Sequence, residues 1–418
     1  MGRKMKRIAV IGGGASGLSA TIEAGRTIKL TRMPIEVTVL ERNPRVGKKL
    51  LLTGNGRCNL TNTSLFPDAY STPRAITVIR TLSEDTRAFF SGLGIMTCCD
   101  EAGRVYPHSM QAGSVVNAMR GEAERLGVQI CTDAMAESIR RKDGGFLINE
   151  ELFADAVIMA CGGCAYPATG SDGNGYRLMK SLGIPCTRAL PSLTGLEVAD
   201  RDFKALKGVR AKAVVTAHID GKAVASERGE VQFTEYGVSG IAVMQLSRLI
   251  TRALDRDKHC ETVLMIDLAP DVEQSQIIDF LENLCWQKPK MLTADLLAGI
   301  VPRQLGFYLL KRCGIPIGEN ACGSISRKMI ATIAGQIRAF RLRIVSARGF
   351  EQAQVTAGGA RLSAFDSHLM ARQLAGLFAC GEILDVDGMC GGYNLEWAFS
   401  SGRLCGRNAV DFLIGEES

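Results

Sequence analysis

The chain has few of the features that mark membrane, nucleic-acid-binding or metal-binding proteins. Only 6% of its 418 residues are aromatic and only 4 are His, and no apolar run approaches the roughly 18 residues of a membrane-spanning helix. Basic residues form a run only at positions 3–7, and the net charge of +7 is small for this length. We therefore expect neither a membrane nor a nucleic acid as a partner.

Other signals are missing as well. The apolar segment after Arg7 breaks at Gly12, unlike a signal peptide, so we expect a cytoplasmic protein with its 14 Cys reduced. Cys98 and Cys99 have no second pair at zinc spacing, so no metal site is expected. The His residues are scattered and are expected to be surface or hydrogen-bonded groups: His108, His218, His259 and His368.

The remaining composition is that of a globular protein with a large core. Apolar residues make up 46% of the chain and charged residues 22%. This length favours more than one domain and removes the need for disulfides to stabilise the fold. Composition alone does not indicate a function, so the short motifs that can form a ligand-binding site carry the information.

A glycine-rich turn near the start is the first such motif. Gly12, Gly14 and Gly17 fit G-x-G-x-x-G between a β-rich run and a helix-forming stretch. The first glycine permits a tight turn, the second lets a pyrophosphate approach the backbone, and the third allows close helix packing. Glu41 ends the second strand, 35–40, where a carboxylate can accept hydrogen bonds from a ribose. Together they predict a parallel sheet that binds a dinucleotide.

The pattern changes in the middle of the chain. Alternation of apolar and polar residues over 209–219, the Asp220-Gly221 pair and a return run at 222–225 predict a β-hairpin. Runs at 262–268 and 340–345 predict further strands, with amphipathic helices between them at about 270–338. The sequence thus predicts a first domain over 1–190, an insert over 191–345 and a return to the first domain over 346–418.

Two polar loops favour FAD over NAD as the dinucleotide. One is the Gly-punctuated segment 47–62, which follows the acidic strand end where a NAD-type sheet would enter a helix. The other follows a short strand near the end of the chain, with Gly381-Glu382, an acidic loop and Gly391-Gly392 before a helix at 397–404. Such a loop can hold a ribityl chain and direct backbone N–H groups at the flavin C2=O edge.

These motifs together resemble those of the BaiN/YhiN-like flavoproteins, also called the aminoacetone-oxidase family of FAD-dependent enzymes. The matching segments span nearly the whole chain: 12–17, 56–59, 103–107, 170–175, 233–240, 355–359 and 381–394. The resemblance implies an α/β fold, in which a glutathione-reductase-like Rossmann domain carries an inserted antiparallel β-barrel-like and helical region. The sequence departs from the family pattern at four positions: Asn55 for Gly, Glu235 for His, Ile241 for Pro and Cys161 for Thr. Asn tolerates left-handed backbone angles, so Asn55 is expected to keep the turn.

The motifs and the resemblance give a set of candidate site residues. We expect FAD to be bound by Gly12, Gly14, Ala15, Ser16, Gly17, Glu41, Arg42, Lys49, Gly56, Asn59, Gly162, Gly381, Glu382, Asp385, Gly392, Tyr393 and Asn394. Arg57, Cys58 and Tyr393 are the candidates for a catalytic role, with Tyr106 a further candidate proton donor. Arg57 would stabilise reduced flavin or bind an anionic substrate, whereas Cys58 would tune the flavin or pack.

The implied function is two-electron hydride transfer through the flavin N5. The resemblance implies either NAD(P)H-linked reduction of an activated C=C bond in an enone or steroid-like small molecule, which we favour, or oxidation of an aminoacetone-type amine by oxygen. NAD(P)H would bind only transiently, because no second G-x-G-x-x-G follows a strand. A non-catalytic flavin sensor or RNA-associated protein is a further alternative. The Cys161-Gly162-Gly163-Cys164 segment leaves open a disulfide reductase, although we favour packing for these thiols.

Overall fold

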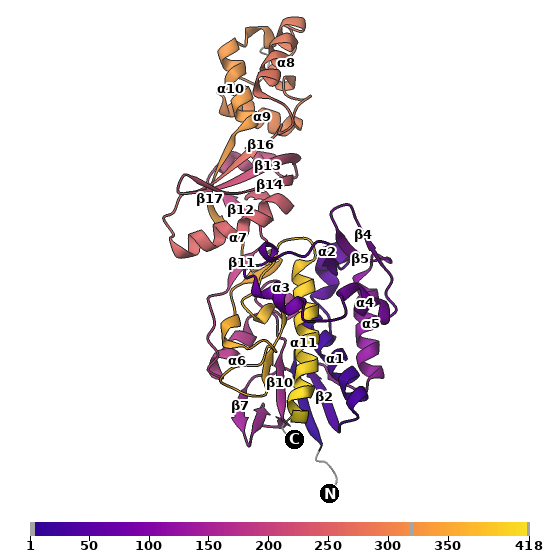
Figure 1. Ribbon diagram of the computed structural model, residues 1–418. Helices are drawn as coiled ribbons and strands as arrows, with labels where there is room; N and C mark the ends of the chain where they lie inside the picture. The colour runs from indigo at the N-terminus through magenta and orange to yellow at the C-terminus, as the bar shows by residue number, and fades with distance from the viewer. Residues whose placement is uncertain (1–4, 318–320, 416–418) are drawn as a thin grey trace. The chain divides into compact units, whose positions relative to one another are not determined.

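The fold was examined in a computed structural model that describes residues 5–317 and 321–415. The chain divides into two compact units: unit 1 comprises residues 1–190 and 354–418, and unit 2 comprises residues 191–353. Figure 1 shows the elements of both units. Each unit has its own hydrophobic core, so each is described by itself.

Unit 1 is built on a parallel sheet. Its strand order is β19 (Leu377–Ala379), β10 (Ala156–Met159), β1 (Lys6–Ile11), β2 (Ile35–Leu40) and β6 (Gln129–Cys131). Strands β1, β10 and β19 are apolar runs that are buried along most of their length, as expected for a sheet covered on both faces, whereas β2 alternates and the edge strand β6 is only partly buried. Because β1 is central and β19 comes from the end of the chain, both parts of the sequence contribute to one sheet. The predicted Rossmann-type architecture is confirmed.

Two long helices pack closely against each other in unit 1. They are α1 (Ala15–Thr31) and α11 (Tyr393–Gly415), which lie side by side in Figure 1. A Cβ added at Gly402 would lie 2.2 Å from the carbonyl oxygen of Ser16, so only glycine permits this approach. The sequence predicted α11 only over 397–404, but buried Ala409, Val410 and Leu413 extend its apolar face.

A buried cluster of charges joins the same two helices. Glu23 of α1 accepts a hydrogen bond of 2.6 Å from Arg407 of α11 and lies 3.7 Å from Arg403. The Arg403 guanidinium, which is 1% exposed, also donates to Glu84 at 2.6 Å and lies over the ring of Phe89. Burial is tolerated here because each charge has an opposite partner.

The remaining elements of unit 1 are short. Its other helices are α2 (Thr53–Gly56), α3 (Arg74–Ile79), α4 (Thr86–Gly92), α5 (Ala112–Arg125) and α6 (Asn174–Ser181). Its other strands are β3 (Thr61–Asn62), β4 (Thr97–Cys99), β5 (Arg104–Pro107), β7 (Ile139–Lys142), β8 (Gly145–Ile148), β9 (Leu152–Ala154) and β18 (Val355–Ala357), and β11 (Leu190–Ser192) spans the boundary with unit 2.

Unit 2 contains a closed barrel and a group of helices. The barrel order is β12 (Leu196–Val198), β15 (Gly237–Ser239), β14 (Lys222–Phe233), β13 (Arg210–Ile219), β16 (Thr262–Asp267) and β17 (Phe340–Ala347). Helix α7 (Ile241–Arg256) packs on the barrel, and α8 (Gln274–Gln287), α9 (Arg303–Arg312) and α10 (Arg327–Arg338) gather at one end of the unit. The predicted antiparallel barrel and helical region are confirmed.

The β13–β14 hairpin is longer than the sequence indicates. Asp220 and Gly221 form its turn with positive φ angles, as the pattern predicted. However, β14 continues to Phe233, whereas the return run was predicted to end at Ala225. Exposed polar residues occupy alternate positions in the middle of β14, and its inward face becomes fully buried only from Val231. Apolar periodicity alone therefore missed most of the strand.

Candidate cofactor-binding site

The turn between β1 and α1 contains two glycines that the fold itself requires. Gly12 has a φ of +106°, and a Cβ there would lie 2.6 Å from the carbonyl oxygen of Ala160 in the neighbouring strand region. A Cβ on Gly17 would lie 1.9 Å from the Gly12 carbonyl oxygen. These contacts bring α1 close against the sheet and fix where the helix begins.

Gly14 differs from Gly12 and Gly17, because no packing contact requires a glycine at this position. Its φ is −81°, an ordinary value, and a Cβ there would meet nothing within 4 Å. It is the N-cap of α1, where no side chain caps the helix and no acidic residue lies in the first turn. The N–H groups of Ala15 and Ser16 thus begin a helix whose positive end faces open space. That arrangement fits a dinucleotide pyrophosphate.

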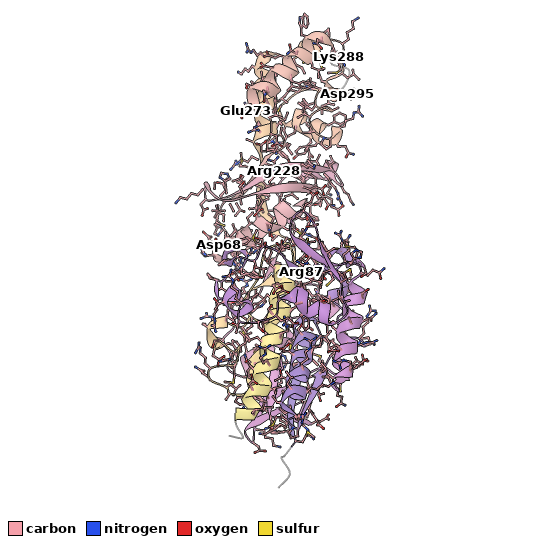
Figure 2. The ribbon with its side chains drawn as sticks, turned by 45° about the vertical axis from the view of Figure 1, so that its right-hand side comes forward. Asp68, Arg87, Arg228, Glu273, Lys288 and Asp295 are labelled. Carbon is pink, nitrogen blue, oxygen red and sulfur yellow. The ribbon has the colours of Figure 1, made fainter. Side chains whose placement is uncertain are left out.

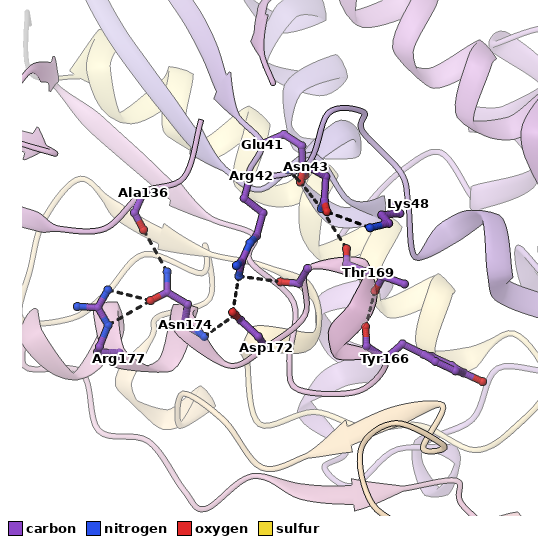
Figure 3. A network of polar contacts seen from close by, with 11 residues as sticks. Glu41, Arg42, Asn43, Lys48, Ala136, Tyr166, Thr169, Asp172, Asn174 and Arg177 are labelled. Atoms are coloured by element: carbon purple, nitrogen blue, oxygen red, sulfur yellow. Dashed lines mark hydrogen bonds and ion pairs between the residues drawn. The ribbon is translucent and has the colours of Figure 1, made fainter. Parts of the chain in front are cut away.

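Glu41 lies beside this turn, just after β2. Its buried carboxylate accepts a hydrogen bond from the Gly13 N–H at 2.9 Å. It also accepts from the Asn43 N–H at 2.8 Å and from the Asn43 side-chain amide at 2.6 Å (Figure 3). A carboxylate offers about four acceptor positions, so one stays available for a ribose hydroxyl. The acidic residue is therefore oriented by the protein before any ligand binds.

Arg42 points away from Glu41 toward a second group of residues. It pairs with Asp172, which also accepts from the Asn174 N–H at 3.1 Å; Asn174 in turn donates to the Ala136 carbonyl at 3.1 Å (Figure 3). Burial is the largest single influence on the pKa of Asp172 and raises it, but the hydrogen bond and charge of Arg42, together with the backbone N–H of Asn174, lower the pKa below its usual value. Arg42 is thus neutralised by an ionised partner.

The loop over 53–58 has an unusual backbone. Gly54, Asn55 and Gly56 have φ angles of 57°, 57° and 80°, and Cys58 has 60°. Asn55 therefore adopts the left-handed conformation expected from its replacement of glycine, which confirms that prediction. Four of the five residues at 54–58 therefore have left-handed backbone angles, and for Asn55 and Cys58 this conformation is strained.

Two of the catalytic candidates lie in this loop. Cys58 is fully buried, and burial raises its thiol pKa to about 12, although a hydrogen bond with Thr53 opposes the shift. Its thiol is consequently protonated at neutral pH and packs in the core. Arg57 is exposed, with its guanidinium 5.1 Å from the centre of the Tyr106 ring and its Nε donating to the Gly54 carbonyl at 3.1 Å. Only Arg57 can meet a ligand in solution.

The Gly-Glu segment at the end of β19 reaches the same turn from the other end of the chain. A Cβ on Gly381 would lie 2.5 Å from the Ser16 hydroxyl oxygen, so the two motifs touch. The Glu382 carboxylate binds Lys49 Nζ at 2.7 Å and accepts from the Thr356 N–H at 2.7 Å. Asp385 accepts from the Thr187 hydroxyl at 2.9 Å. The carboxylates of Glu382 and Asp385 are therefore both held in place by hydrogen bonds along this loop.

The start of α11 is held by two asparagines. With its amide oxygen toward the Gly392 N–H, Asn59 accepts at 3.0 Å and donates to the carbonyls of Thr61 and Val105. Asn394 accepts from the Gly388 N–H at 2.7 Å and donates back to its carbonyl at 2.9 Å. Both predicted cofactor residues thus bind backbone, which positions the loop.

Tyr393 begins α11 and is largely enclosed by aromatic rings. The rings of Phe66 and Tyr70 lie edge-on, with centroids at 5.9 and 6.0 Å. Burial raises the pKa of the Tyr393 phenol. The third catalytic candidate is thus a protonated phenol at neutral pH.

The pKa shifts of Cys161 and Cys164 are those of thiols that pack in a protein interior. Burial raises the pKa of Cys161 to about 12 and also raises the pKa of Cys164. A redox-active dithiol needs the opposite shift. Between them, Gly162 has a φ of +72°, and a Cβ there would lie 2.8 Å from the Ser171 hydroxyl and 4.0 Å from Glu382. This turn therefore lies against the Gly-Glu loop.

Several residues that organise the site were absent from the candidate set. Asn43 supplies two of the hydrogen bonds to Glu41, Thr356 orients Glu382, and Ser401 accepts from the Gly381 N–H at 2.9 Å. Asn43 lies two positions after the acidic strand end, which is a usable signal, whereas the other two follow only from the tertiary fold.

The described residues contain no group of three or more His, Cys, Asp or Glu placed to hold a metal ion. Within the same residues, no helix is long and apolar enough to cross a membrane.

Comparisons with known proteins match nearly the whole chain. Residues 6–408 match the family described as HI0933-like protein Rossmann domain. The chain is 38% identical to the 3-dehydro-bile acid delta(4,6)-reductase of Clostridium scindens, covering 97% of this chain and 100% of that protein. It is 27% identical to the ribosomal RNA dihydrouridine synthase of Haemophilus influenzae, covering 95% and 96%. A solved 3-ketosteroid delta1-dehydrogenase from Sterolibacterium denitrificans aligns over 97% of this chain and 99% of its own, with 11% identity and a TM-score of 0.48.

The family match and the full-length reductase relative agree with the dinucleotide-binding turn, the acidic strand end and the Gly-Glu loop. The chain is an enzyme, and its candidate FAD-binding residues all lie in unit 1. It belongs to the HI0933-like Rossmann family and is a BaiN-like flavoprotein oxidoreductase.

Proposed function

We propose that the enzyme uses NAD(P)H to reduce a C=C bond conjugated to a carbonyl group in a steroid-like small molecule. The observation that carries this proposal is the 38% identity, over the full length of both proteins, to a 3-dehydro-bile acid delta(4,6)-reductase. A cytoplasmic location, where thiols stay reduced, is part of the proposal.

The reaction balances with one nicotinamide and one proton. NAD(P)H loses a hydride, the β carbon of the enone gains it, and the α carbon takes a proton from the protein or water. When bound, FAD accepts the hydride and passes it on through N5. The products are NAD(P)⁺ and the saturated ketone.

The residues of the chain have separate tasks in this scheme. The N-terminus of α1, opened by Gly14, binds the pyrophosphate, and Glu41 binds the ribose. Glu382 and Lys49 hold the ribityl side of the site through their 2.7 Å ion pair. None of these residues exchanges a proton with the substrate, so they set cofactor affinity and orientation.

Among the catalytic candidates, Tyr393 fits a proton donor best. Its phenol carries a proton at neutral pH, and it stands at the start of α11, beside the loop that carries Glu382. Arg57, which is exposed, would bind an anionic group of the substrate. Cys58 is assigned a packing role, because its buried thiol neither ionises nor reaches solvent.

The second candidate substrate is a uracil base in ribosomal RNA. Two relatives, at 27% and 26% identity, are named ribosomal RNA dihydrouridine synthases. Dihydrouridine is uridine with its C5=C6 bond reduced, and that bond is also conjugated to a carbonyl. The same hydride and proton additions would serve both substrates. Amine oxidation by oxygen, the other chemistry that the resemblance implies, would proceed without an enone substrate, so the two chemistries can be separated by experiment.

Anaerobic spectroscopy of the FAD-loaded enzyme tests the proposal. We expect NADH or NADPH to bleach the flavin bands, and a 3-oxo-4-ene steroid to restore them with formation of the saturated ketone. Reoxidation by unmodified ribosomal RNA, but not by the steroid, would support the second candidate. Persistence of the bands with both nicotinamides, together with bleaching by aminoacetone, would refute the reductase.

A Tyr393→Phe variant separates the two half-reactions. Bleaching by the nicotinamide should keep its rate, whereas reoxidation by the enone should slow by roughly 100-fold, within the usual range for general acid catalysis. Tyr166→Phe is a matched control, because it makes the same change at a tyrosine that is not a candidate proton donor. Tyr166 lies in a turn near Arg42 (Figure 3). Equal rates of reoxidation in the wild type and Tyr393→Phe would remove the proton-donor role.

A further inference from the structure

A cavity of about 600 Å³ lies wholly within unit 2. It opens between the outer side of the β13–β14 hairpin and the helical end of the unit. Lys212 and Arg228 line it from the hairpin, and Ile277, Phe280 and Ile300 line it from the helical end. Figure 2 labels Arg228 on the barrel and Glu273 at the start of α8. All lining residues lie between positions 212 and 300, so none belongs to the cofactor-binding motifs.

One wall of the cavity is apolar. Ile277 and Phe280 come from one face of α8, and Ile300 comes from the segment before α9. The Phe280 side chain is 48% exposed, and its ring lies 4.0 Å from where a Cβ on Gly299 would stand. A half-exposed aromatic ring in a concave wall is a favourable surface for an apolar ring of a ligand.

The opposite wall carries charge, because it is the outward-facing side of the barrel hairpin. Arg228 is paired with Asp271 across the cavity. Glu230 is paired with Arg210 at 3.1 Å. Glu230 faces Lys212 across the hairpin but is held by Arg210, so among the described residues no carboxylate lies within ion-pair distance of Lys212, and its ammonium is the one lining charge without an ion-pair partner.

We propose that this cavity binds an organic monoanion with a rigid apolar body. The apolar body would lie against Phe280 and Ile277, and the anionic group would pair with Lys212. The volume falls within the range of about 300–1,000 Å³ that small-molecule sites occupy. A neutral ligand would leave the Lys212 charge unused, and a dianion would have to break the Arg228–Asp271 pair.

Equilibrium dialysis of the FAD-loaded, full-length enzyme tests the site. The probes are 1-anilinonaphthalene-8-sulfonate and N-phenyl-1-naphthylamine, which share an aromatic body and differ in the sulfonate. We expect saturable binding of one sulfonate probe per chain. Lys212→Met should weaken it about fivefold, as for a partly exposed ion pair, and leave the neutral probe unchanged.

Two further variants complete the test. Phe280→Ser should weaken both probes, since it removes the apolar wall. Lys222→Met, an exposed lysine at the turn of the same hairpin and outside the cavity, should change neither. Both lysine variants alter exposed side chains, so folding is retained. The proposal is overturned if no saturable site is found, if Lys212→Met binds the sulfonate like the wild type, or if Lys222→Met loses as much affinity. Binding does not depend on turnover, so the result is independent of the proposed reductase activity.

Discussion

Replacing two glycines of the same turn by alanine should have opposite consequences for stability and cofactor affinity. At Gly12 the φ of +106° disfavours any L residue, at a cost of about 1–3 kcal/mol. The added Cβ would also lie 2.6 Å from the Ala160 carbonyl oxygen, and such overpacking costs a further 1–3 kcal/mol or so. Gly12→Ala should therefore lose roughly 2–6 kcal/mol, a large share of the 5–15 kcal/mol or so that stabilises a typical domain.

Gly14→Ala should be almost neutral for folding. Its φ of −81° suits alanine and the Cβ meets nothing within 4 Å, so only a weaker N-cap is expected, below about 1 kcal/mol. The methyl group would instead occupy the space that we propose for the pyrophosphate. Loss of one charge-assisted hydrogen bond, about 1.5–3 kcal/mol, would raise the FAD Kd by about 10- to 150-fold. Gly14→Val should give colourless protein.

The assay combines urea unfolding of the apoproteins with FAD titration. Gly121→Ala is the matched control: it lies in the exposed middle of α5, with nothing within 4 Å of an added Cβ. It should gain about 0.5–1 kcal/mol and leave FAD affinity unchanged. A Gly14→Ala protein with a wild-type Kd, or with the instability expected at Gly12, would refute the assignment of this turn.

Three other changes have defined outcomes. Arg403→Met should lower the free energy of unfolding by about 1–3 kcal/mol in urea titrations, because Glu84 loses its 2.6 Å partner and Glu23 keeps only Arg407; an unchanged free energy of unfolding would contradict this. Alkylation followed by mass spectrometry at pH 8 should label exposed Cys99 and spare Cys58, whose pKa burial raises to about 12. Since an unfolded thiol titrates near 9.0, the stability that Cys58 contributes should be complete below that pH and decline as the pH rises toward 12. Glu382→Gln, which breaks the 2.7 Å pair with Lys49, should weaken FAD roughly tenfold without a comparable loss of stability, as measured by the same titrations.

Local patterns in the sequence predicted the parts of this molecule that depend on neighbouring residues. The glycine-rich turn was identifiable because its spacing reflects backbone constraints at Gly12 and Gly17. The hairpin turn at Asp220 was identifiable because two consecutive positive φ angles demand such residues. The strands of the insert were identifiable because apolar residues there recur at every second position, as they do in a half-buried strand.

The interior arrangement of the site was beyond the reach of such patterns. Lys49 and Glu382 form an ion pair although 333 positions separate them, and nothing near either residue specifies the other. Asn59 is predicted as a cofactor ligand, and the hydrogen bonds that its amide makes to the backbone could not be read from the sequence. Whether a polar residue contacts a ligand or braces a loop depends on the direction of its side chain, which tertiary packing sets.

The use of both chain ends in one sheet has a consequence for synthesis. At about 5–20 residues per second, β19 leaves the ribosome roughly 20–75 s after β1, and α11 follows it. Until then the apolar edge of β10 that pairs with β19 has no neighbour, and the face of α1 that Gly402 contacts is uncovered. Unit 2 is contiguous and can fold in that interval. Nascent unit 1 thus keeps an unpaired strand edge and an uncovered apolar helix face until translation is nearly finished, and such surfaces are prone to aggregation.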